Sequence, residues 1–441
     1  MNSRVHFFIL KFFFHKYIKL DTQKILQALD LSSFIAFDFE TTGLDSVNDR
    51  VIEIAAIRFE NGGIVDRFVS LINPGRDIPP LISEITGISN LMVKNAPTED
   101  KIIDEFLGFL GNSPLVAHNI HFDEKFLSEL CSRHGREEKN FIKYDTLQLA
   151  RSVLFEQPVF NLTALSDYYG LSSDGAHRAE NDTKNTGMIF LELINEVAGY
   201  PLEIISKVNS ILQGSKVPNH QLYKNLAKEL TKKGDLKKGL IKQKTTPDCN
   251  ANIFSHIGER NIDSLSASDV FGENGTLSDV HPNFESRPNQ KQYAQLVNDI
   301  LSETGKVGVI EAGTGLGKSM AYLFCAIKES VNVDENGPVI IACNTKHLQD
   351  QLFHKDLPLL SQALDVPIKA VMLKGRKNYI CKTRLNWLFA DSKTLDTIDL
   401  EALIPVLFWI SWTKTGDISE CSGFLNTRRS WLKAFISSDT G

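Results

Sequence analysis

The sequence lacks several features that would place it in a specialised class of protein. Its six cysteines form no Cys-x-x-Cys pair and no regular framework, which excludes a disulfide scaffold and favours reduced thiols in a cytosol. Long apolar runs are missing too. Residues 1–20 are rich in Phe, but they are too short and too charged to span a bilayer, and no small-residue cleavage site follows them. We therefore expect a cytoplasmic protein without a membrane partner, although a surface-lying anchor or a misassigned start stays open for this stretch.

A strongly basic composition is also missing. The formal net charge is −6. A nucleic-acid-binding domain with a pI above about 9 would instead carry a net positive charge at neutral pH. Gathered carboxylates make a metal-dependent nuclease acidic while its phosphate-binding lysines lie in local patches, so nucleic acid is not excluded as a partner. With 42% hydrophobic and 23% charged residues, the composition is that of an ordinary soluble globular protein. A length of 441 residues predicts about two or three domains.

Hydrophobic periodicity divides the chain into two α/β patterns. The first combines expected strands and a hairpin turn with later helices; the strands are 34–40, 51–59 and 64–72, the turn is 61–63, and the helices are 101–111, 123–134, 146–155 and 182–197. The second is a βαβ pattern with helices at 289–302 and 317–330 and strands at 307–311 and 339–343. We therefore expect an N-terminal extension at 1–33, a first domain at 34–197, a basic and polar linker at 198–283, and an incomplete second domain at 284–441.

Acidic side chains recur at three places in the first pattern. Asp38 and Glu40 lie two positions apart on an expected strand, so their carboxylates project from the same face. Asp123 stands at an expected helix start after an apolar strand, and Asp182 follows His177 by five positions. Each motif alone has a structural reading, because an aspartate at a helix start is very often a cap. Carboxylate oxygens are also the ligands that Mg²⁺ and Mn²⁺ prefer.

Taken in order, these motifs resemble the DEDDh exonuclease family, the proofreading-subunit type within the ribonuclease H-like fold. The resemblance covers roughly Phe34 to Val197. It implies two Mg²⁺ or Mn²⁺ ions that bridge the scissile phosphate, with His177 as the base that takes a proton from the attacking water. The metal ligands that it implies are Asp38, Glu40, Asp123 and Asp182. The residues that it implies for nucleic-acid contact are Thr41, Thr42, Gly43, His118 and Asn119.

One further acidic residue, Asp145, fits a structural role better than a role as a metal ligand. Asp145 and Gln148 have the spacing of a helix capping box ahead of an apolar helix. We therefore interpret Asp145 as a cap and leave it out of the predicted site.

A glycine-rich loop follows the expected strand 307–311 and opens the expected helix 317–330, which is the context that a phosphate-binding P-loop requires. Its backbone N–H groups and the helix N-terminus would cradle phosphates, Lys318 would reach the β and γ positions, and Ser319 would hold Mg²⁺. The sequence therefore predicts ATP binding with Mg²⁺. The loop consists of Ala312, Gly313, Thr314, Gly315, Leu316, Gly317, Lys318 and Ser319.

Three further segments resemble elements of superfamily 2 helicases. Gln290, at the end of 284–290, corresponds to the residue that reads adenine, and Thr345 and Lys346 lie in a segment similar to the first DNA-contacting motif. Residues 374–381 are similar to a segment of DinG-type helicases. An exonuclease domain fused in front of such a helicase part resembles the DinG-type nucleases of bacteria. This resemblance implies single-stranded nucleic acid and ATP as partners and makes DNA replication and repair proteins candidates.

Two features of a complete helicase are missing before Gly441. Neither an Asp-Glu-x-His box nor a second RecA-like domain occurs, so we expect nucleotide binding without DNA unwinding by this chain. Cys381 stands where iron-sulfur helicases place a first cluster ligand, but only Cys421 follows it, whereas four ligands are expected. We therefore expect no iron-sulfur cluster.

The leading hypothesis is a 3′-5′ exonuclease that trims single-stranded DNA, or RNA, with an ATP-binding helicase-like module attached. Two alternatives are a catalytically weak docking module that binds nucleic acid and ATP, and a polymerase-associated proofreading exonuclease. The complete set of five nuclease residues argues against the first, and the P-loop argues against the second. DNA and RNA both stay open, because no motif here defines contacts to the 2′-OH.

Overall fold

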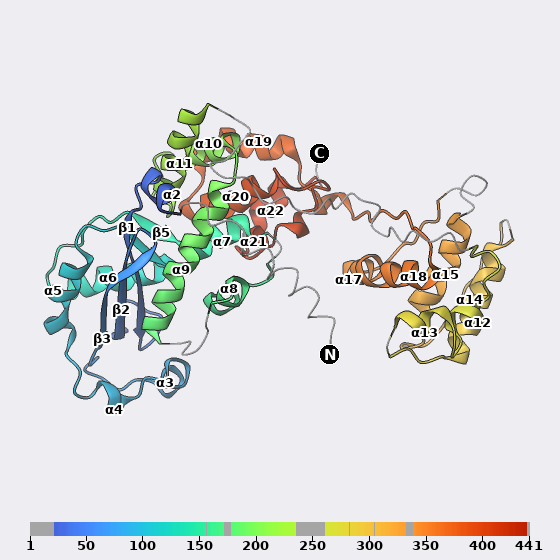
Figure 1. The fold of residues 1–441 in the computed structure, drawn as a ribbon, viewed down its shortest axis with the longest axis horizontal. Coiled ribbons are helices and arrows are strands. Elements are labelled where there is room, and N and C mark those ends of the chain that lie inside the picture. Colours follow the sequence, from blue (N-terminus) through green and yellow to red (C-terminus); the bar gives the residue numbers. More distant parts are fainter. Residues whose placement is uncertain are drawn as a thin grey trace. The chain divides into compact units, whose positions relative to one another are not determined.

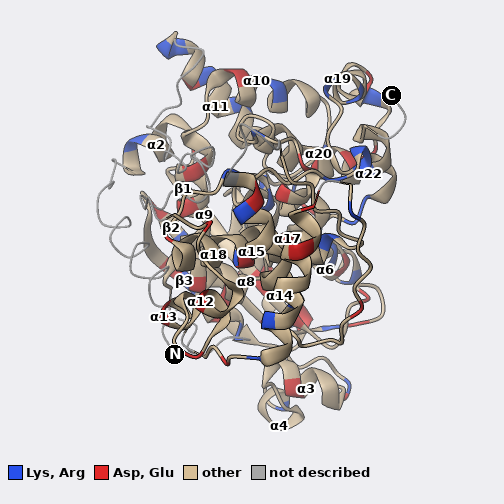
Figure 2. Cartoon of the chain, turned by 90° about the vertical axis from the view of Figure 1, so that its right-hand side faces the viewer, with Lys and Arg blue, Asp and Glu red and all other residues tan. Residues whose placement is uncertain are grey.

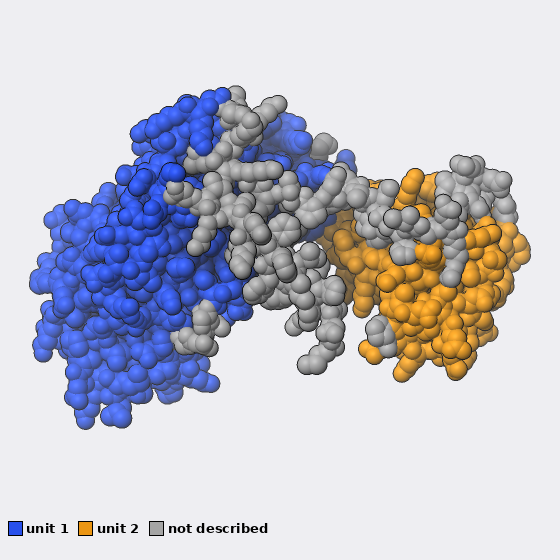
Figure 3. Space-filling model, in the orientation of Figure 1, with its two compact units in different colours: residues 1–244, 376–441 blue, residues 245–375 orange. Residues whose placement is uncertain are grey.

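The computed structural model describes residues 22–155, 157–171, 178–234, 261–281, 283–303, 305–331 and 338–438. His177, the predicted base, lies outside the described residues. The chain forms two compact units, which Figure 3 distinguishes by colour. Residues 1–244 and 376–441 make up the first unit, and residues 245–375 make up the second.

A mixed sheet of five strands, in the order β3-β2-β1-β4-β5, forms the centre of the first unit (Figure 1). The first three strands run antiparallel in sequence order, whereas β4 is parallel to both β1 and β5. The three longer strands confirm those expected from alternation, and Asn61 and Gly62 turn between β2 and β3 with positive φ angles of 50° and 84°. The strands are β1 (Ser33–Thr41), β2 (Val51–Glu60), β3 (Gly63–Leu71), β4 (Leu115–Ala117) and β5 (Lys143–Asp145).

The two faces of β1 contribute to different hydrophobic cores. Phe34 belongs to a core shared with α9 (Ala179–Ala198), whose Phe190 ring lies 5.2 Å from the Phe34 ring, centroid to centroid. Phe37 and Phe39 belong to the opposite core, which also contains residues of α5 (Glu99–Leu110) and α6 (Ile120–Arg133). Asp38 and Glu40 alternate with these phenylalanines, so they lie on the face that α9 covers.

Helices beyond the expected first domain complete the core of the first unit. Within 198–283, expected to be a linker, α10 (Leu202–Ile211) and α11 (His220–Lys233) bury apolar residues in the same core as Phe34. The remaining helices of the described first unit are α2 (Thr22–Ala28), α3 (Pro80–Thr86), α4 (Asn90–Val93), α7 (Thr146–Val153), α8 (Leu162–Tyr169), η2 (Arg376–Asn378), α19 (Lys382–Ala390), η3 (Ser392–Thr394), α20 (Thr397–Trp409), η4 (Ile418–Glu420), α21 (Ser422–Leu425) and α22 (Ser430–Ile436).

Residues 376–438, which we call the return segment, pack into the first unit although they follow the P-loop region in the sequence. Phe408 of α20 is fully buried, and its ring centroid lies 4.6 Å from that of Tyr200. Ser422 donates a hydrogen bond to the carbonyl oxygen of Gln157 at 2.7 Å, and a Cβ added at Gly423 would overlap the carbonyl oxygen of Arg151. The compact units therefore divide the chain differently from the expected domain boundaries, which assign all of 284–441 to one domain.

Helices dominate the described part of the second unit. The helices on either side of the glycine-rich loop form as expected, within one residue of the predicted bounds. The expected strands at 307–311 and 339–343 do not form, and Val307 and Val309 are 89% and 97% exposed. A strand needs a hydrogen-bonded neighbour, and the described residues of this unit include no strand to pair with. The helices are α12 (Ala267–Phe271), α13 (Thr276–Val280), α14 (Pro288–Leu301), α15 (Lys318–Val331), α17 (Lys346–Gln351), η1 (Leu352–Asp356) and α18 (Leu357–Leu364).

Surface charge and helix hydropathy follow the composition. Figure 2 shows Lys and Arg interspersed with Asp and Glu along the helices of that view, in keeping with the sequence pI of about 6.0. Among the helices of the described ranges, none combines the length and the apolar character that crossing a bilayer requires.

Candidate active site

The predicted site begins at the end of β1, where Asp38 and Glu40 project toward α9. Burial, followed by the charges of Asp182 and Glu53, raises the pKa of Asp38 to about 7. Burial also raises the pKa of Glu40 to about 8, with Asp38 and Asp182 as the next largest causes. Carboxylates on two different elements therefore act on one another at this end of the strand.

Asp123 joins this group from the first turn of α6. Its Oδ1 accepts a hydrogen bond from the backbone N–H of Phe39 at 3.1 Å, which fixes the carboxylate beside β1. The side chain is buried, and burial together with the charge of Asp38 raises its pKa well above the usual value. Asp182 lies in the first turn of α9, which β1 and β2 both contact. The four carboxylates predicted as ligands are thus brought to one end of the sheet.

The chemistry of these side chains fits divalent cations. Their oxygens are hard ligands of the kind that Mg²⁺ and Mn²⁺ take, and like charges in a shielded place repel one another unless a cation lies between them. The described ranges contain no group of three His, Cys, Asp or Glu side chains arranged to hold an ion.

Glu53 is a member of the acidic group that sequence reasoning missed. It is paired with Glu40 in the register of β1 and β2, and its side chain is only 1% exposed. Its carboxylate accepts hydrogen bonds from Arg178 Nη2 at 2.8 Å and from the backbone N–H of Ala179 at 3.1 Å. An acidic residue within the otherwise apolar start of β2 was the signal that could have revealed it.

The loop that precedes Asp123 is held by a buried network centred on Asp145. Asn119 has a left-handed backbone with a φ of 69°, and its N–H donates to Asp145 Oδ1 at 3.1 Å. The same oxygen accepts the N–H of Leu147 at 2.8 Å, which confirms that Asp145 caps α7. Asn219, immediately before α11, accepts the N–H of Asp145 at 3.0 Å. A residue outside the expected first domain therefore supports the loop that leads to Asp123.

His118 lies at the interior side of this loop. Its Nδ1 lies 2.9 Å from Thr146 Oγ1, and burial lowers its pKa, which favours the neutral imidazole at neutral pH. Asn119 is exposed, so its side chain remains accessible to a ligand.

The Thr41-Thr42-Gly43 turn is organised by its own side chains. Thr41 Oγ1 donates to the carbonyl oxygen of Gly43 at 2.6 Å, and Thr42 Oγ1 donates to Asp49 Oδ1 at 3.0 Å. A Cβ at Gly43 would overlap the Asp49 carboxylate, so this position has room for glycine alone while Asp49 stays in place. These bonds shape a turn next to Glu40, and contact of the turn with a nucleotide stays a prediction.

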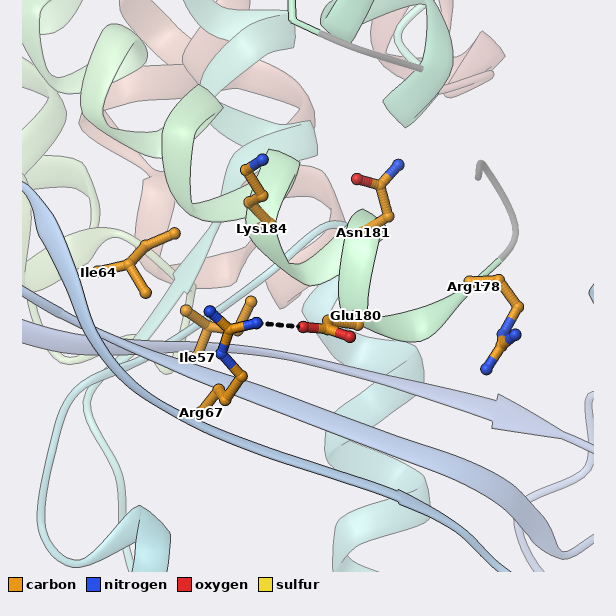
Figure 4. Close-up of a pocket in the computed structure, with 7 residues that line it drawn as sticks. All are labelled: Ile57, Ile64, Arg67, Arg178, Glu180, Asn181 and Lys184. Carbon is orange, nitrogen blue, oxygen red and sulfur yellow. Dashed lines mark hydrogen bonds and ion pairs between the residues drawn. The ribbon is translucent and has the colours of Figure 1, made fainter. Parts of the chain in front are cut away.

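An open pocket of about 590 Å³ lies beside the first turns of α9 (Figure 4). Basic side chains from β3, from α9 and from the residue that precedes α9 line it, and one of them, Arg67 on β3, forms an exposed ion pair with Glu180 at 2.8 Å. The lining residues are Ile57, Ile64, Arg67, Arg178, Glu180, Asn181 and Lys184.

In the second unit, the glycine-rich loop turns directly into α15. Gly315 and Gly317 adopt φ angles of 79° and 85°, which glycine tolerates better than other residues. Lys318 Nζ donates to the carbonyl oxygens of Ala312 at 2.5 Å and Gly313 at 3.1 Å. Gln290 Nε2 donates to the carbonyl oxygen of Gly317 at 3.0 Å. The predicted phosphate-binding and adenine-reading residues therefore contact the same loop.

Thr345 and Lys346, predicted to contact nucleic acid, lie at the start of α17. Thr345 Oγ1 accepts the N–H of Leu348 at 3.2 Å, so this side chain is a helix cap in the structure. Its contact with nucleic acid stays a prediction.

Comparisons with known proteins give three kinds of similarity. Residues 35–190 match the RNase_T family model, whose description is Exonuclease. The 3′-5′ exonuclease DinG of Bacillus subtilis (strain 168) is 30% identical over 394 residues, which cover 88% of this chain and 41% of that protein. The protein of the same name in Staphylococcus epidermidis is 29% identical, with coverage of 89% and 42%. The chain thus spans less than half the length of these relatives.

Solved structures show similarity over a smaller part of the chain. Exonuclease X in complex with 5′ overhanging duplex DNA is 27% identical with a TM-score of 0.30, and the aligned part covers 37% of this chain and 91% of that one. The nuclease domain of 3′hExo, a DEDDh family member bound to rAMP, is 20% identical with a TM-score of 0.33, and coverage is 37% and 92%.

Proposed function

We propose, on the premise that residues 35–190 form an exonuclease domain, that this chain hydrolyses phosphodiester bonds at the 3′ ends of single-stranded DNA or RNA and releases nucleoside monophosphates. The observation that carries this proposal is the group of carboxylates at the end of β1, whose charges raise one another's pKa and all of which lie inside the matched residues. The similarity to relatives named 3′-5′ exonuclease DinG supports the 3′-to-5′ direction.

The proposed roles follow from the elements that carry each side chain. Asp38, Glu40, Asp123 and Asp182 would hold two Mg²⁺ or Mn²⁺ ions, which when bound supply charge neutralisation at the scissile phosphate and a lowered pKa for the attacking water. His177 would accept the proton of that water, because an imidazole with an ordinary pKa can take a proton at neutral pH.

Substrate positioning would come from the two loops beside the carboxylates. The turn at Thr41 to Gly43 follows Glu40 directly and would bind the terminal nucleotide. Asn119, exposed in a left-handed conformation just before α6, would contact the same nucleotide from the other side of Asp123.

For the second unit we propose ATP binding with Mg²⁺ at residues 312–319 and adenine reading by Gln290. The direct transition from the glycine-rich loop into α15 supports this proposal, because it aims the N-terminus of a helix at the place where phosphates would bind. Lys318 would leave the carbonyl oxygens of Ala312 and Gly313 for the β and γ phosphates. Contact with replication or repair proteins stays a prediction.

A digestion experiment tests the nuclease. Single strands of DNA and RNA labelled at the 3′ or the 5′ end are incubated with Mg²⁺ or Mn²⁺ and the wild-type chain, the Asp38→Ala variant or the Asp167→Ala variant. Asp167 is an exposed carboxylate on α8 and provides the matched control. Stepwise 3′ shortening by the wild type and by Asp167→Ala, but not by Asp38→Ala, is expected. Intact strands with every variant would contradict the proposal.

A further inference from the structure

The carboxylate of Glu53 connects β2 to the segment that enters α9. One oxygen accepts from Arg178 Nη2 at 2.8 Å, and the other accepts from the backbone N–H of Ala179 at 3.1 Å and from Arg178 Nε at 3.4 Å. Arg178 lies next to His177 in the sequence, and Asp182 follows in the first turn of the helix. Figure 4 shows Arg178 extending from the chain just ahead of α9. We call this arrangement of Glu53, Arg178 and the Ala179 N–H the clasp.

Burial of Glu53 is difficult to explain by stability alone. A buried carboxylate is costly unless it is paired and hydrogen-bonded, and this one is paired with Glu40 in the sheet register. Its charge also disfavours the ionised forms of Asp38 and Glu40. An apolar side chain would avoid these costs, as its neighbours Ile52 and Ile54 do. What the carboxylate provides is a fixed acceptor for the start of α9.

The start of α9 has no cap of its own. Arg178 occupies the N-cap position, but its side chain makes no capping hydrogen bond, and the N–H of Ala179 is satisfied from β2 instead. A second anchor lies about two turns along the helix, where a Cβ added at Gly187 would overlap the ring of Phe59, also on β2. Close packing at Gly187 sets the distance between helix and sheet, and the clasp fixes where the helix begins.

We propose that Glu53 and Arg178 are positioning residues that hold the first turn of α9, and with it Asp182, in place relative to the carboxylates of β1. This inference rests on the proposed exonuclease function. Both oxygens of Glu53 are engaged by Arg178 and Ala179, so in this proposal Glu53 acts through the segment that it holds and not as a metal ligand.

The test compares two Arg–Glu pairs that meet the same pocket. Glu53→Gln leaves a single side-chain oxygen that cannot serve Arg178 and Ala179 as a carboxylate does, and Arg178→Ala removes the other partner. Arg67→Ala is the matched control, because Arg67 and Glu180 form an ion pair of the same length, 2.8 Å, whose side chains are 66% and 45% exposed. An exposed pair of this kind contributes little.

We expect Glu53→Gln and Arg178→Ala to lower kcat by about 10- to 100-fold with little change in KM, as the loss of an outer-shell partner does. The double variant should be no slower than the slower single variant, because both changes open the same clasp. Arg67→Ala should retain the wild-type kcat. Calorimetric titration with Mg²⁺ should give the wild-type number of bound ions for Glu53→Gln, and one fewer ion would overturn the positioning role in favour of direct ligation.

Hydrogen exchange provides a readout that does not depend on cleavage. Peptides covering 178–190 should exchange faster in Glu53→Gln and Arg178→Ala than in the wild type, whereas Arg67→Ala should leave their exchange unchanged. If the wild type fails to cleave but exchange responds in this way, the proposed function fails and the clasp stands. If kcat and exchange are both unchanged in Glu53→Gln, the clasp is overturned whatever the wild type does.

Discussion

All four tryptophans of the chain lie in the return segment, at positions 387, 409, 412 and 431. Tryptophan fluorescence therefore reports on residues that follow the P-loop unit in the sequence. Trp409 is fully buried in the same core as Phe34 and Phe190, so this fluorescence should report the unfolding of the whole first unit. We expect Mg²⁺ at the Asp38 site to stabilise the environment of these tryptophans.

The size of the effect follows from linkage. A ligand that binds the folded state alone raises the free energy of unfolding by about 2.7 kcal/mol when its concentration is 100 times its Kd. For a denaturant slope of roughly 1 to 3 kcal/mol per M of urea, the midpoint of the tryptophan transition should rise by about 1 to 3 M. Urea titrations with and without Mg²⁺, at a concentration set from a measured Kd, provide the measurement.

Two controls distinguish stabilisation by Mg²⁺ bound at the Asp38 site from a general effect of salt. Asp38→Ala should remove the Mg²⁺-dependent shift, and an equal ionic strength of NaCl should not reproduce it in the wild type. A tryptophan transition that ignores Mg²⁺ while far-ultraviolet circular dichroism reveals a second transition that responds to it would refute the shared core. The return segment would then unfold separately from the sheet.

Three other predictions follow from individual side chains. Phe408→Ala should lower the free energy of unfolding of the first unit by about 3 to 5 kcal/mol in urea denaturation, and Phe435→Ala, at a 38% exposed position of the return segment, should lower it by much less. Burial raises the pKa of Asp38 to about 7 and that of Glu40 to about 8, so the metal-free folded chain keeps protons that the unfolded chain loses near pH 4. The free energy of unfolding without metal should therefore fall as the pH rises from about 4 to about 8. Saturating Mg²⁺ should oppose this fall. A metal-free free energy of unfolding that rises over this range would contradict the raised pKa values of the two carboxylates. Lys318→Ala should weaken binding of a fluorescent ATP analogue about tenfold or more, as measured by anisotropy, because a charge-assisted contact of at least roughly 1.4 kcal/mol is lost.

Local patterns were enough to predict the three long strands of the first unit and the acidic residues at the end of β1, whereas the strands expected at 307–311 and 339–343 do not form. The alternation of Phe and acidic residues in 34–40 predicts which side chains share a face, and the structure assigns the phenylalanines on the two sides to different cores. The Asp145 cap was likewise predictable, because a capping interaction spans a few residues. Both features depend on neighbours within one element, which a single sequence displays directly.

Contacts between distant segments were not predictable in the same way. Glu53 and Arg178 are 125 positions apart, and nothing in either local sequence indicates the other. Asn219 lies 74 positions from Asp145, beyond the point where the sequence suggested a linker. One signal was available for the return segment: residues 402–409 are uninterrupted apolar residues, as in a helix buried on all sides.

The extent of this core changes what counts as the nuclease part of the chain. The match to the family model ends at residue 190, but the loop that precedes Asp123 has supports from well beyond it. His121, in the first turn of α6, lies between Glu124 and Glu401 of the return segment, with its Nε2 at 2.8 Å from Glu401. Hydrogen bonds to Glu124 and then to Glu401 raise its pKa to about 10, so the imidazole is charged at neutral pH and both carboxylates attract it.

In the sequence, the second unit is therefore preceded and followed by segments that belong to a single core. A fragment that ends near residue 197 would lose Tyr223 and Phe408, which bury their rings against each other at a centroid distance of 6.0 Å, and it would expose the apolar surface that they cover. The matched exonuclease residues thus define where the chemistry is encoded, whereas the stability of that site depends on chain that both precedes and follows the glycine-rich loop.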